Sequence, residues 1–383
     1  MIAFTFPGQG SQRPGMGAPW KDHESWELVT EASDLSGRDI GRLLLETEAD
    51  ELTDTRNAQI ATFVLSLVVL DAVVRTGVVP ARLAGHSLGE YSALTATGVL
   101  GFEDGVRLVA ERGDAMAEAG SRQVGTMAAV LGLDDGQVEI ACSRVPGDVW
   151  VANFNAPGQV VIAGSPEAIE QAGATAKEMG AKRVLPVPVS GAFHTPFMAA
   201  ARTRLNEALA SAELRDAETP VVANVDALPH TDAGDWESLM AAQLCTPVRW
   251  RQITHHLADA GVNTFVELGP GNVLTGMVKR TISASRNLSV SVPDDLDTLL
   301  EQLSGQPAAE CGQHEGEHLF ATERMVVSPG AGVFAPHAIA EPGRAISRGE
   351  VLGTVADEEV RSPFAGTIMG VLALDGERVT QAQ

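Results

Sequence analysis

Residues 82–97 read RLAGHSLGEYSALTAT, and this stretch decides the fold predicted for the chain. Arg82–Gly85 is a short apolar run that ends in a turn signal, as strands do, and Leu88–Thr97 continues with a helical pattern. The GHSLG at residues 85–89 fits G-x-S-x-G, in which a serine stands on a sharp turn between a strand and a helix. Strand, turn and helix in this order predict a parallel α/β sheet covered by helices.

The turn itself predicts a nucleophile. A strand that reverses into a helix within a few residues brings two backbones close together, so small residues must flank the serine. The Ser87 hydroxyl then stands at the carboxyl end of the strand, and the amide of Leu88 lies at a helix N-terminus, where an oxyanion is favoured. The motif is common by chance, but here the strand and the helix accompany it.

A serine nucleophile needs a base, and the chain has nine histidines. His194 follows the predicted strand Arg183–Val189 in a loop before a helix, where side chains reach an active-site mouth. His86 is the neighbour of Ser87 on the turn, so we expect it to point elsewhere and line the pocket. His255 and His256 lie in a predicted helix and are interpreted as partly exposed helix residues.

Around this turn, the chain divides into four predicted parts. Residues 1–122 and 191–290 alternate strands and helices and are predicted to form the α/β domain. Residues 123–190 follow the order βαββαβ, the ferredoxin-like pattern, and are predicted to form an inserted subdomain. Residues 291–322 are predicted to be an acidic linker, polar and Gly-rich from Gly305 to Thr322. Residues 323–383 carry short β-type runs between turn signals, which predict a small all-β domain.

Composition excludes several classes of function. The net charge is −23, of which residues 290–383 carry −10, so nucleic acid is not an expected partner. The three cysteines form no CxxC pair, which fits a reducing cytoplasm without disulfides. The N-terminus has no basic segment ahead of an apolar one, and Ala61–Val74 is too short to span a bilayer. We therefore expect a cytoplasmic protein without a membrane partner.

His314–His318 (HEGEH) formally matches the zinc motif H-E-x-x-H. The segment has a central glycine, no apolar face and a linker composition, so a stable helix is not expected there. The sequence accordingly predicts no metal site and no cofactor.

Seven motifs follow one another in the first 285 residues. They are FPGQGSQ at 6–12, GHSLGEYSAL at 85–94, ERG at 111–113 with Met116, NFNAPGQ at 153–159, GAFHTPFM at 191–198, Gln243 ahead of PVRW at 247–250, and ELGPG at 267–271. Together, in this order, they resemble the malonyl-CoA:acyl-carrier-protein transacylases and the related acyltransferase domains of polyketide synthases. The resemblance covers residues 1 to about 285 and implies a parallel-sheet, hydrolase-like acyltransferase domain.

The resemblance implies a role for each site residue. Ser87 would be the nucleophile, His194 the general base and acid, and Gln243 the residue that orients His194. The backbone amides of Gln9 and Leu88 would form the oxyanion hole.

The remaining implied residues bind the acyl group. Arg112 would pair with the malonyl carboxylate, which a guanidinium can hold in a two-pronged geometry. The alternative for Arg112 is a surface helix arginine paired with Glu111 or Asp114. Phe193 resembles the malonyl-selecting form of the family, and Leu88 fits the same choice. His86 and Asn155 complete the predicted substrate-binding set.

The implied activity is malonyl transfer from malonyl-CoA to the phosphopantetheine thiol of an acyl carrier protein, by a ping-pong mechanism through Ser87. Carrier proteins are usually acidic, so an acidic enzyme would need a local basic patch. The candidates are Arg249, Arg251, Lys279, Arg280 and the pair Lys182–Arg183.

Residues after about 323 resemble a biotinyl/lipoyl-type β-sandwich, or hammerhead fold. The resemblance rests on APH at 335–337, PGRAISRGEVL at 342–352 and VRSPFAGTI at 360–368. Working carriers place a lysine on the hairpin between the halves, where this chain has residues 354–359, TVADEE. The last lysine of the chain is Lys279, so covalent biotin or lipoate is excluded. A role in docking or assembly and a purely stabilising role stay open.

Three other functions remain open on the sequence alone. A hydrolase with the same turn is opposed by Arg112, since neutral acyl chains have no use for a buried cation. A non-catalytic scaffold is opposed by the intact set of Ser87, His194, Arg112 and Gln9. An acyltransferase that serves a polyketide synthase or a malonate decarboxylase is not distinguished from one in fatty acid synthesis.

Overall fold

The computed structural model of the chain forms two compact units, Met1–Phe320 and Ala321–Gln383, which are described separately. The residues that the structure describes are 1–189, 191–303, 332–337, 344–347, 349–355, 358–362, 366–368 and 378–379.

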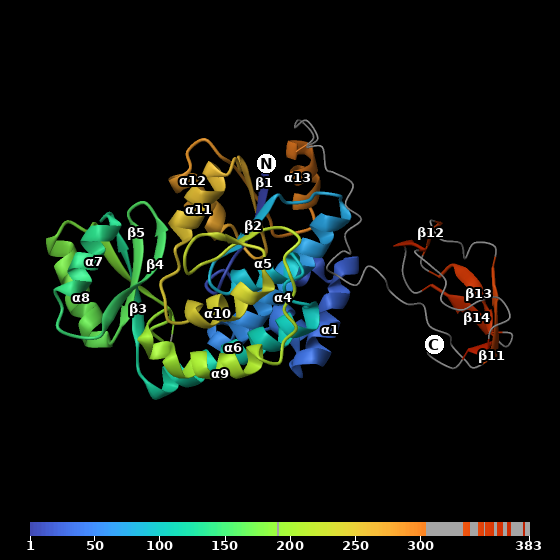
Figure 1. The fold of residues 1–383 in the computed structure, drawn as a ribbon, viewed down its shortest axis with the longest axis horizontal. Helices are drawn as coiled ribbons and strands as arrows, with labels where there is room; N and C mark the ends of the chain where they lie inside the picture. Colours follow the sequence, from blue (N-terminus) through green and yellow to red (C-terminus); the bar gives the residue numbers. More distant parts are fainter. Residues whose placement is uncertain are drawn as a thin grey trace. The chain divides into compact units, whose positions relative to one another are not determined.

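The first unit is built on a six-stranded sheet with the order β10-β9-β1-β2-β7-β8. Figure 1 labels two of its strands, β1 and β2. All neighbouring strands pair in parallel except β7 and β8, so the predicted parallel α/β sheet is confirmed. The central strand β1 is apolar and buried, with Phe4 and Phe6 fully covered. The strands are β1 Ile2–Phe6, β2 Arg82–Gly85, β7 Val221–Val222, β8 Pro229–His230, β9 Thr264–Leu268 and β10 Arg286–Val290.

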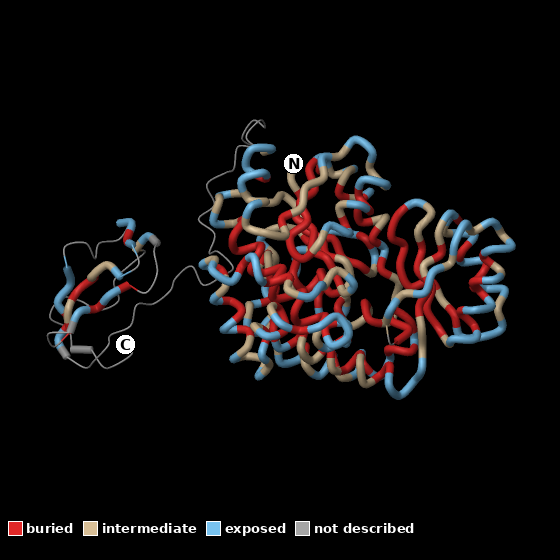
Figure 2. Tube along the Cα trace, turned by 180° about the vertical axis from the view of Figure 1, so that it is seen from behind, coloured by how far each residue is buried: buried red, intermediate tan, exposed pale blue. Residues whose placement is uncertain are grey.

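Helices cover this sheet, and two long ones, α4 and α6, lie against each other (Figure 1). Helix α4 is long and apolar enough to cross a membrane, but 89% of its apolar window is buried, so it is a core helix. Figure 2 shows that buried residues fill the interior of this unit. The helices are α1 Glu27–Ser36, α2 Ile40–Leu45, α3 Ala49–Thr53, α4 Thr55–Arg75, α5 Gly89–Ala96, α6 Phe102–Arg122, α9 Ala199–Leu209, α10 Ala233–Gln243, α11 Trp250–Asp259, α12 Val273–Thr281 and α13 Asp295–Leu303.

The inserted subdomain has the predicted βαββαβ order. Its antiparallel sheet has the order β4-β5-β3-β6, and α7 and α8 pack on it over a separate apolar core that includes Val130 and Ile162 (Figure 1). The main-chain groups of Phe154 and Val248 join β4 to the main domain through a 2.9 Å hydrogen bond. The elements are β3 Thr126–Leu131, α7 Asp135–Ser143, β4 Val149–Ala156, β5 Gln159–Gly164, α8 Pro166–Glu178 and β6 Arg183–Val187.

The predicted linker 291–322 is wrong at its start, because residues 295–303 form helix α13. Leu299 is buried in the main core, and the Asp295 carboxylate accepts hydrogen bonds from the backbone amides of Ser291 and Val292. The acidic residues lie in the first helical turn, where negative charge is favoured. The acidic residues that were interpreted as the start of a linker therefore begin a helix. Residues 304–322 lie outside the described residues.

The second unit contains small antiparallel sheets, in agreement with the predicted all-β domain. One sheet has the order β14-β13-β11-β16, and the other pairs β12 with β15. The middle of the 354–359 hairpin lies outside the described residues. The strands are β11 Gly332–Pro336, β12 Ala345–Ile346, β13 Val351–Val355, β14 Glu358–Arg361, β15 Gly366–Thr367 and β16 Arg378–Val379.

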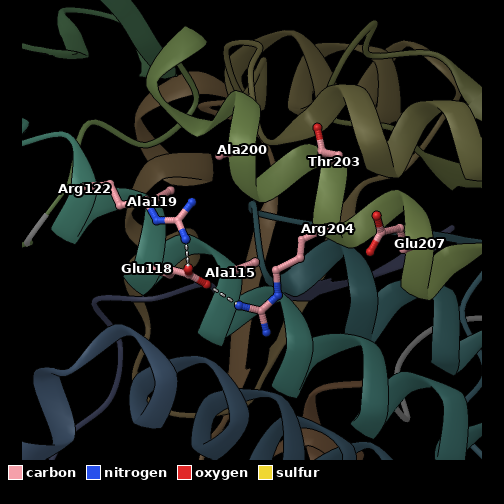
Figure 3. A pocket seen from close by; sticks show the side chains of 8 residues that line it. All are labelled: Ala115, Glu118, Ala119, Arg122, Ala200, Thr203, Arg204 and Glu207. Atoms are coloured by element: carbon pink, nitrogen blue, oxygen red, sulfur yellow. Dashed lines mark hydrogen bonds and ion pairs between the residues drawn. The ribbon is translucent and has the colours of Figure 1, made fainter.

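An ion-pair cluster fastens α9 to α6. The Arg204 guanidinium lies 2.5 Å from Glu111 and 2.6 Å from Glu118, and Glu118 also pairs with Arg122. Figure 3 shows Glu118, Arg122 and Arg204 at a surface pocket of about 160 Å³ between the two helices. The pocket is lined by Ala115, Glu118, Ala119, Arg122, Ala200, Thr203, Arg204 and Glu207. None of the predicted site residues lines it.

Candidate active site

The turn that carries Ser87 requires glycine on both sides. A Cβ atom at Gly85 would lie 1.9 Å from the backbone of Gly89, and one at Gly89 would lie 2.0 Å from the carbonyl oxygen of Phe6. Ser87 itself has φ 53°, in the left-handed region that L-residues rarely adopt. The sharp turn predicted from GHSLG is therefore present, between β2 and α5.

Ser87 and His194 are in direct contact, although 107 residues separate them. The Ser87 Oγ lies 2.8 Å from the His194 Nε2, and the His194 Nδ1 lies 2.8 Å from the main-chain carbonyl oxygen of Gln243. A carbonyl can only accept, so Nδ1 carries the proton and Nε2 is left to accept from the serine hydroxyl. His194, like Ser87, has a positive φ, of 61°.

Gln243 was predicted to orient His194, and the contact between the two residues is made by the main chain of Gln243. Its main-chain carbonyl, not its amide, contacts the imidazole. Gln243 is the last residue of α10, and carbonyls at a helix end have no partner within the helix. The side-chain amide instead donates from Nε2 to the Ser87 carbonyl oxygen at 2.9 Å and to Glu90, and its Oε1 accepts from Arg112.

Arg112 is a buried cation beside the serine. Its side chain is 1% exposed, and its Nη2 lies 3.1 Å from the Ser87 Oγ and 3.0 Å from the Gln243 Oε1. It also donates to the Gln59 side chain and lies over the Tyr91 ring, 5.3 Å from the ring centre. The surface alternative for Arg112 is excluded, because Glu111 pairs with Arg204 and Asp114 with Arg38.

The buried environment sets the charge of His194. Burial first, and then the nearby Arg112 cation, lower the pKa of His194 to about 3. The imidazole is therefore neutral at physiological pH and able to accept a proton.

The loop after β1 packs directly on the serine turn. A Cβ atom at Gly8 would lie 2.4 Å from the carbonyl oxygen of His86, so the backbone that leads into Gln9 passes close to the turn. The Gln9 side chain donates to the Thr55 hydroxyl at 3.3 Å. The amide of Leu88 lies at the N-terminus of α5. The oxyanion hole of Gln9 and Leu88 remains a prediction.

The other predicted substrate-binding residues border this centre. The His86 Nε2 lies 2.8 Å from the Asn155 Oδ1, and the His86 ring packs against Trp250 with centroids 5.7 Å apart. Burial lowers the pKa of His86. Phe193 is 6% exposed and precedes His194 directly. Their roles toward substrate remain predictions.

Three buried polar residues at this centre were missed in the sequence. The Asn224 Oδ1 accepts from the Ser87 amide at 2.7 Å, and its Nδ2 donates to the Gly85 carbonyl at 2.7 Å. Glu90 contacts both Asn224 and Gln243, and burial raises the pKa of Glu90 to about 7. Gln59 and Glu90 could have been noticed as polar residues in apolar helices. Asn224 follows a two-residue strand and carries no such signal.

No group of three or more His, Cys, Asp or Glu side chains that could hold a metal ion occurs in the described residues. The His314–His318 motif lies outside them.

Comparison with known proteins places this centre in a class. A family model described as an acyl transferase domain matches residues 3–297. The chain is 41% identical over 307 residues to the malonyl CoA-acyl carrier protein transacylase of Bacillus subtilis (strain 168), covering 79% of this chain and 97% of that protein. The crystal structure of acyl-carrier-protein S-malonyltransferase from Burkholderia pseudomallei 1710b is 42% identical with a TM-score of 0.76, over 78% of this chain and 99% of that chain.

A third similar structure is a malonyl-transacylase in complex with its type II polyketide synthase acyl carrier protein. It is 38% identical with a TM-score of 0.76, over 79% of this chain and 99% of that chain. The chain belongs to the malonyl-CoA:acyl-carrier-protein transacylase family.

Proposed function

We propose that this protein transfers a malonyl group from malonyl-CoA to the phosphopantetheine thiol of an acyl carrier protein, in the cytoplasm, in fatty acid or polyketide synthesis. One observation carries the proposal. The buried guanidinium of Arg112 lies 3.1 Å from the Ser87 Oγ, and its hydrogen-bond partners, Gln59, Gln243 and Ser87, are all neutral. Its Nε has no acceptor among the described residues. A cation so placed fits a substrate that brings its own carboxylate to the serine.

The first half-reaction loads the enzyme. The His194 Nε2 takes the proton of the Ser87 hydroxyl, and Oγ attacks the thioester carbonyl of malonyl-CoA. The amides of Gln9 and Leu88 stabilise the resulting oxyanion at the end of α5. The C–S bond then breaks, the coenzyme A thiolate takes the proton back from His194, and a malonyl-Ser87 ester remains.

The second half-reaction transfers the malonyl group from Ser87 to the carrier protein. His194 removes the proton of the carrier thiol, the sulfur attacks the malonyl ester, and the Ser87 oxygen leaves with the proton that His194 returns. Arg112 holds the malonyl carboxylate through both steps, so the acyl carbonyl stays in position for the thiol. The backbone hydrogen bond from Ser87 to Asn224 keeps the serine in its strained conformation.

The carrier protein is expected to dock on the basic side chains named from the sequence. Of these, Arg251 lies 2.6 Å from Asp135 of the subdomain and Arg280 donates to Gln159 at 2.5 Å, so both already tie α11 and α12 to the subdomain. Lys279 and Arg249 are exposed. We propose the latter two as the first positions to test for carrier binding.

Intact-mass measurement after mixing with malonyl-CoA tests the proposal, with acetyl-CoA and Ser87→Ala as controls. We expect a malonyl adduct on the wild type only, with little acetyl adduct, and its transfer to an added phosphopantetheinylated carrier protein. Free malonate without an adduct would indicate a hydrolase instead. Neither adduct nor malonate would contradict the assigned substrate.

A further inference from the structure

Glu90 is a fully buried carboxylate that touches none of the reacting atoms. It stands in the first turn of α5, three residues after Ser87. Its Oε1 accepts from the Asn224 backbone amide at 2.6 Å, and its Oε2 accepts from the Gln243 Nε2. Burying an ionised group is costly unless its hydrogen bonds are satisfied, so such a group asks for an explanation. The mechanism above does not use it.

The contacts of Glu90 decide which way the Gln243 amide points. The NH₂ end of that amide faces the Ser87 carbonyl oxygen, which can only accept, and the Glu90 carboxylate, which can only accept when it is ionised. The oxygen end must therefore face Arg112, and the Gln243 Oε1 accepts from the Arg112 Nη2 at 3.0 Å. If the amide turned over, its NH₂ group would oppose the guanidinium, donor against donor.

We infer that Glu90 is a positioning residue that sets the orientation of the Gln243 amide and thereby holds the Arg112 guanidinium beside Ser87. The inference rests on the proposed function, because it concerns how the acyl carboxylate is recognised. A second contact supports it. The same carboxylate holds the Asn224 backbone, and the Asn224 side chain holds the amide of Ser87. One buried group thus braces both the serine turn and the partner of Arg112.

The isosteric variant Glu90→Gln separates this role from simple packing. The oxygen of the substituted side chain would stay on the Asn224 amide, so its NH₂ group would face the NH₂ group of Gln243. Gln243 would then have to turn over and present a donor to Arg112. We expect malonyl loading to fall about 10- to 100-fold, in line with the cost of misplacing a substrate-holding group by about 1 Å. Acetyl loading, which does not use Arg112, should change far less.

The matched control is Glu267→Gln. Glu267 is also fully buried and accepts from two backbone amides, those of Leu274 and Thr275, but it has no contact with Gln243 or Arg112 among the described residues. We expect a lower thermal midpoint in this variant and an unchanged ratio of malonyl to acetyl loading. A fall of that ratio as large as in Glu90→Gln would mean that losing any buried carboxylate has the effect, and would overturn the inference.

The decisive experiment is a double-mutant cycle on the malonyl-to-acetyl loading ratio, measured by intact mass with the full chain. Gln243→Met alone should lower the ratio as Glu90→Gln does, and the double variant should be no worse than Gln243→Met. Additive losses, or a folded Glu90→Gln with the wild-type ratio, would overturn the inference.

If Glu90→Gln does not fold, Glu90→Asp takes its place, since it withdraws the carboxylate from Gln243 by one methylene. The inference then requires a lower ratio in this variant, and a wild-type ratio would overturn it. Failure of the wild type to load malonyl at all would overturn the proposed function, and this inference with it.

Discussion

Ser87 and His194 both have positive φ, a conformation that L-residues rarely adopt. Strained residues persist only where their surroundings hold them, which here means the hydrogen bonds of Asn224 to the turn and of Gln243 to the imidazole. The catalytic pair is thus preorganised by hydrogen bonds to main-chain groups. Under the proposed function the acyl specificity depends on the side-chain contacts of Arg112, and Gln243 and Glu90 connect these contacts to the catalytic pair.

The first prediction concerns the charge of His194. Because its pKa is about 3, the imidazole should remain a working base far below the pH at which an ordinary histidine is protonated. We expect phenylmethanesulfonyl fluoride, which carries no carboxylate and does not depend on Arg112, to modify Ser87 at a similar rate at about pH 5.5 and about pH 8 after correction for reagent stability. Intact mass gives the rate. Half-maximal modification near pH 6.5, the ordinary histidine value, would contradict the prediction.

At the scale of elements, the serine turn depends on the close contact of β1, β2 and α5. Gly89→Ala would drive a methyl group into the Phe6 carbonyl oxygen of β1, which must then move. We expect a loss of at least about 3 kcal/mol in unfolding free energy, the upper part of the range for overpacked sites, together with loss of Ser87 acylation. Denaturant unfolding measures the first and intact mass the second.

Gly276→Ala is the matched control for this variant. Gly276 lies exposed in α12 with nothing within 4 Å of an added Cβ atom. We expect up to about 1 kcal/mol of stabilisation there, because alanine is the better helix former. If both substitutions changed the unfolding free energy by the same amount, the contact of Gly89 with Phe6 would not be the cause of the loss.

Another element-scale prediction concerns the edge of the main sheet. His230 of β8 lies 3.0 Å from Asp226 and 2.8 Å from Asp235, the latter in the first turn of α10. Burial alone would lower the pKa of His230, but the hydrogen bonds to Asp235 and Asp226 raise it above its ordinary value of 6.5. The stabilisation is therefore fully present below pH 6.5 and is lost as the pH rises through the folded-state pKa.

His230→Gln checks this sign. We expect the variant to unfold at a lower temperature than the wild type at about pH 6, by roughly 2 °C for a partly exposed pair worth up to about 1 kcal/mol, and the difference to shrink at about pH 9. Thermal unfolding at the two values measures it. A difference that grows with pH would contradict the assigned charge.

The sequence predicted the serine turn and the inserted subdomain, but it did not predict helix α13 or all of the contacts at the active centre. GHSLG and the βαββαβ order predicted the turn and the subdomain, because local glycines and alternating patterns determine them. Ser87 and Asn224 are in contact although they lie 137 positions apart in the sequence. The strand before Asn224 has only two residues, so no local sequence pattern indicates the contact. The choice between the Gln243 carbonyl and its side chain was likewise missed, because it depends on where α10 ends.

At the scale of the whole molecule, the acyltransferase unit alone aligns with nearly the full length of the relatives. The alignment to the Bacillus subtilis transacylase covers 97% of that protein but only 79% of this chain, and the family model ends at residue 297. Helix α13 then closes the main core through Leu299. The residues after 303 thus add to a fold that its relatives complete without them.

We therefore expect a chain that ends after Leu303 to fold and to load malonyl on Ser87 at a rate within about twofold of the full chain. The physical reason is that the described core of the first unit, from β1 to α13, is complete without later residues. Intact mass with malonyl-CoA measures loading, and transfer to a carrier protein is measured beside it. Normal loading with slower transfer would assign the residues after 303 to carrier docking, whereas loss of loading would contradict the independence of residues 1–303. A chain ending after Val290 is the useful comparison, because without α13 the Leu299 site of the core is left open and stability should fall.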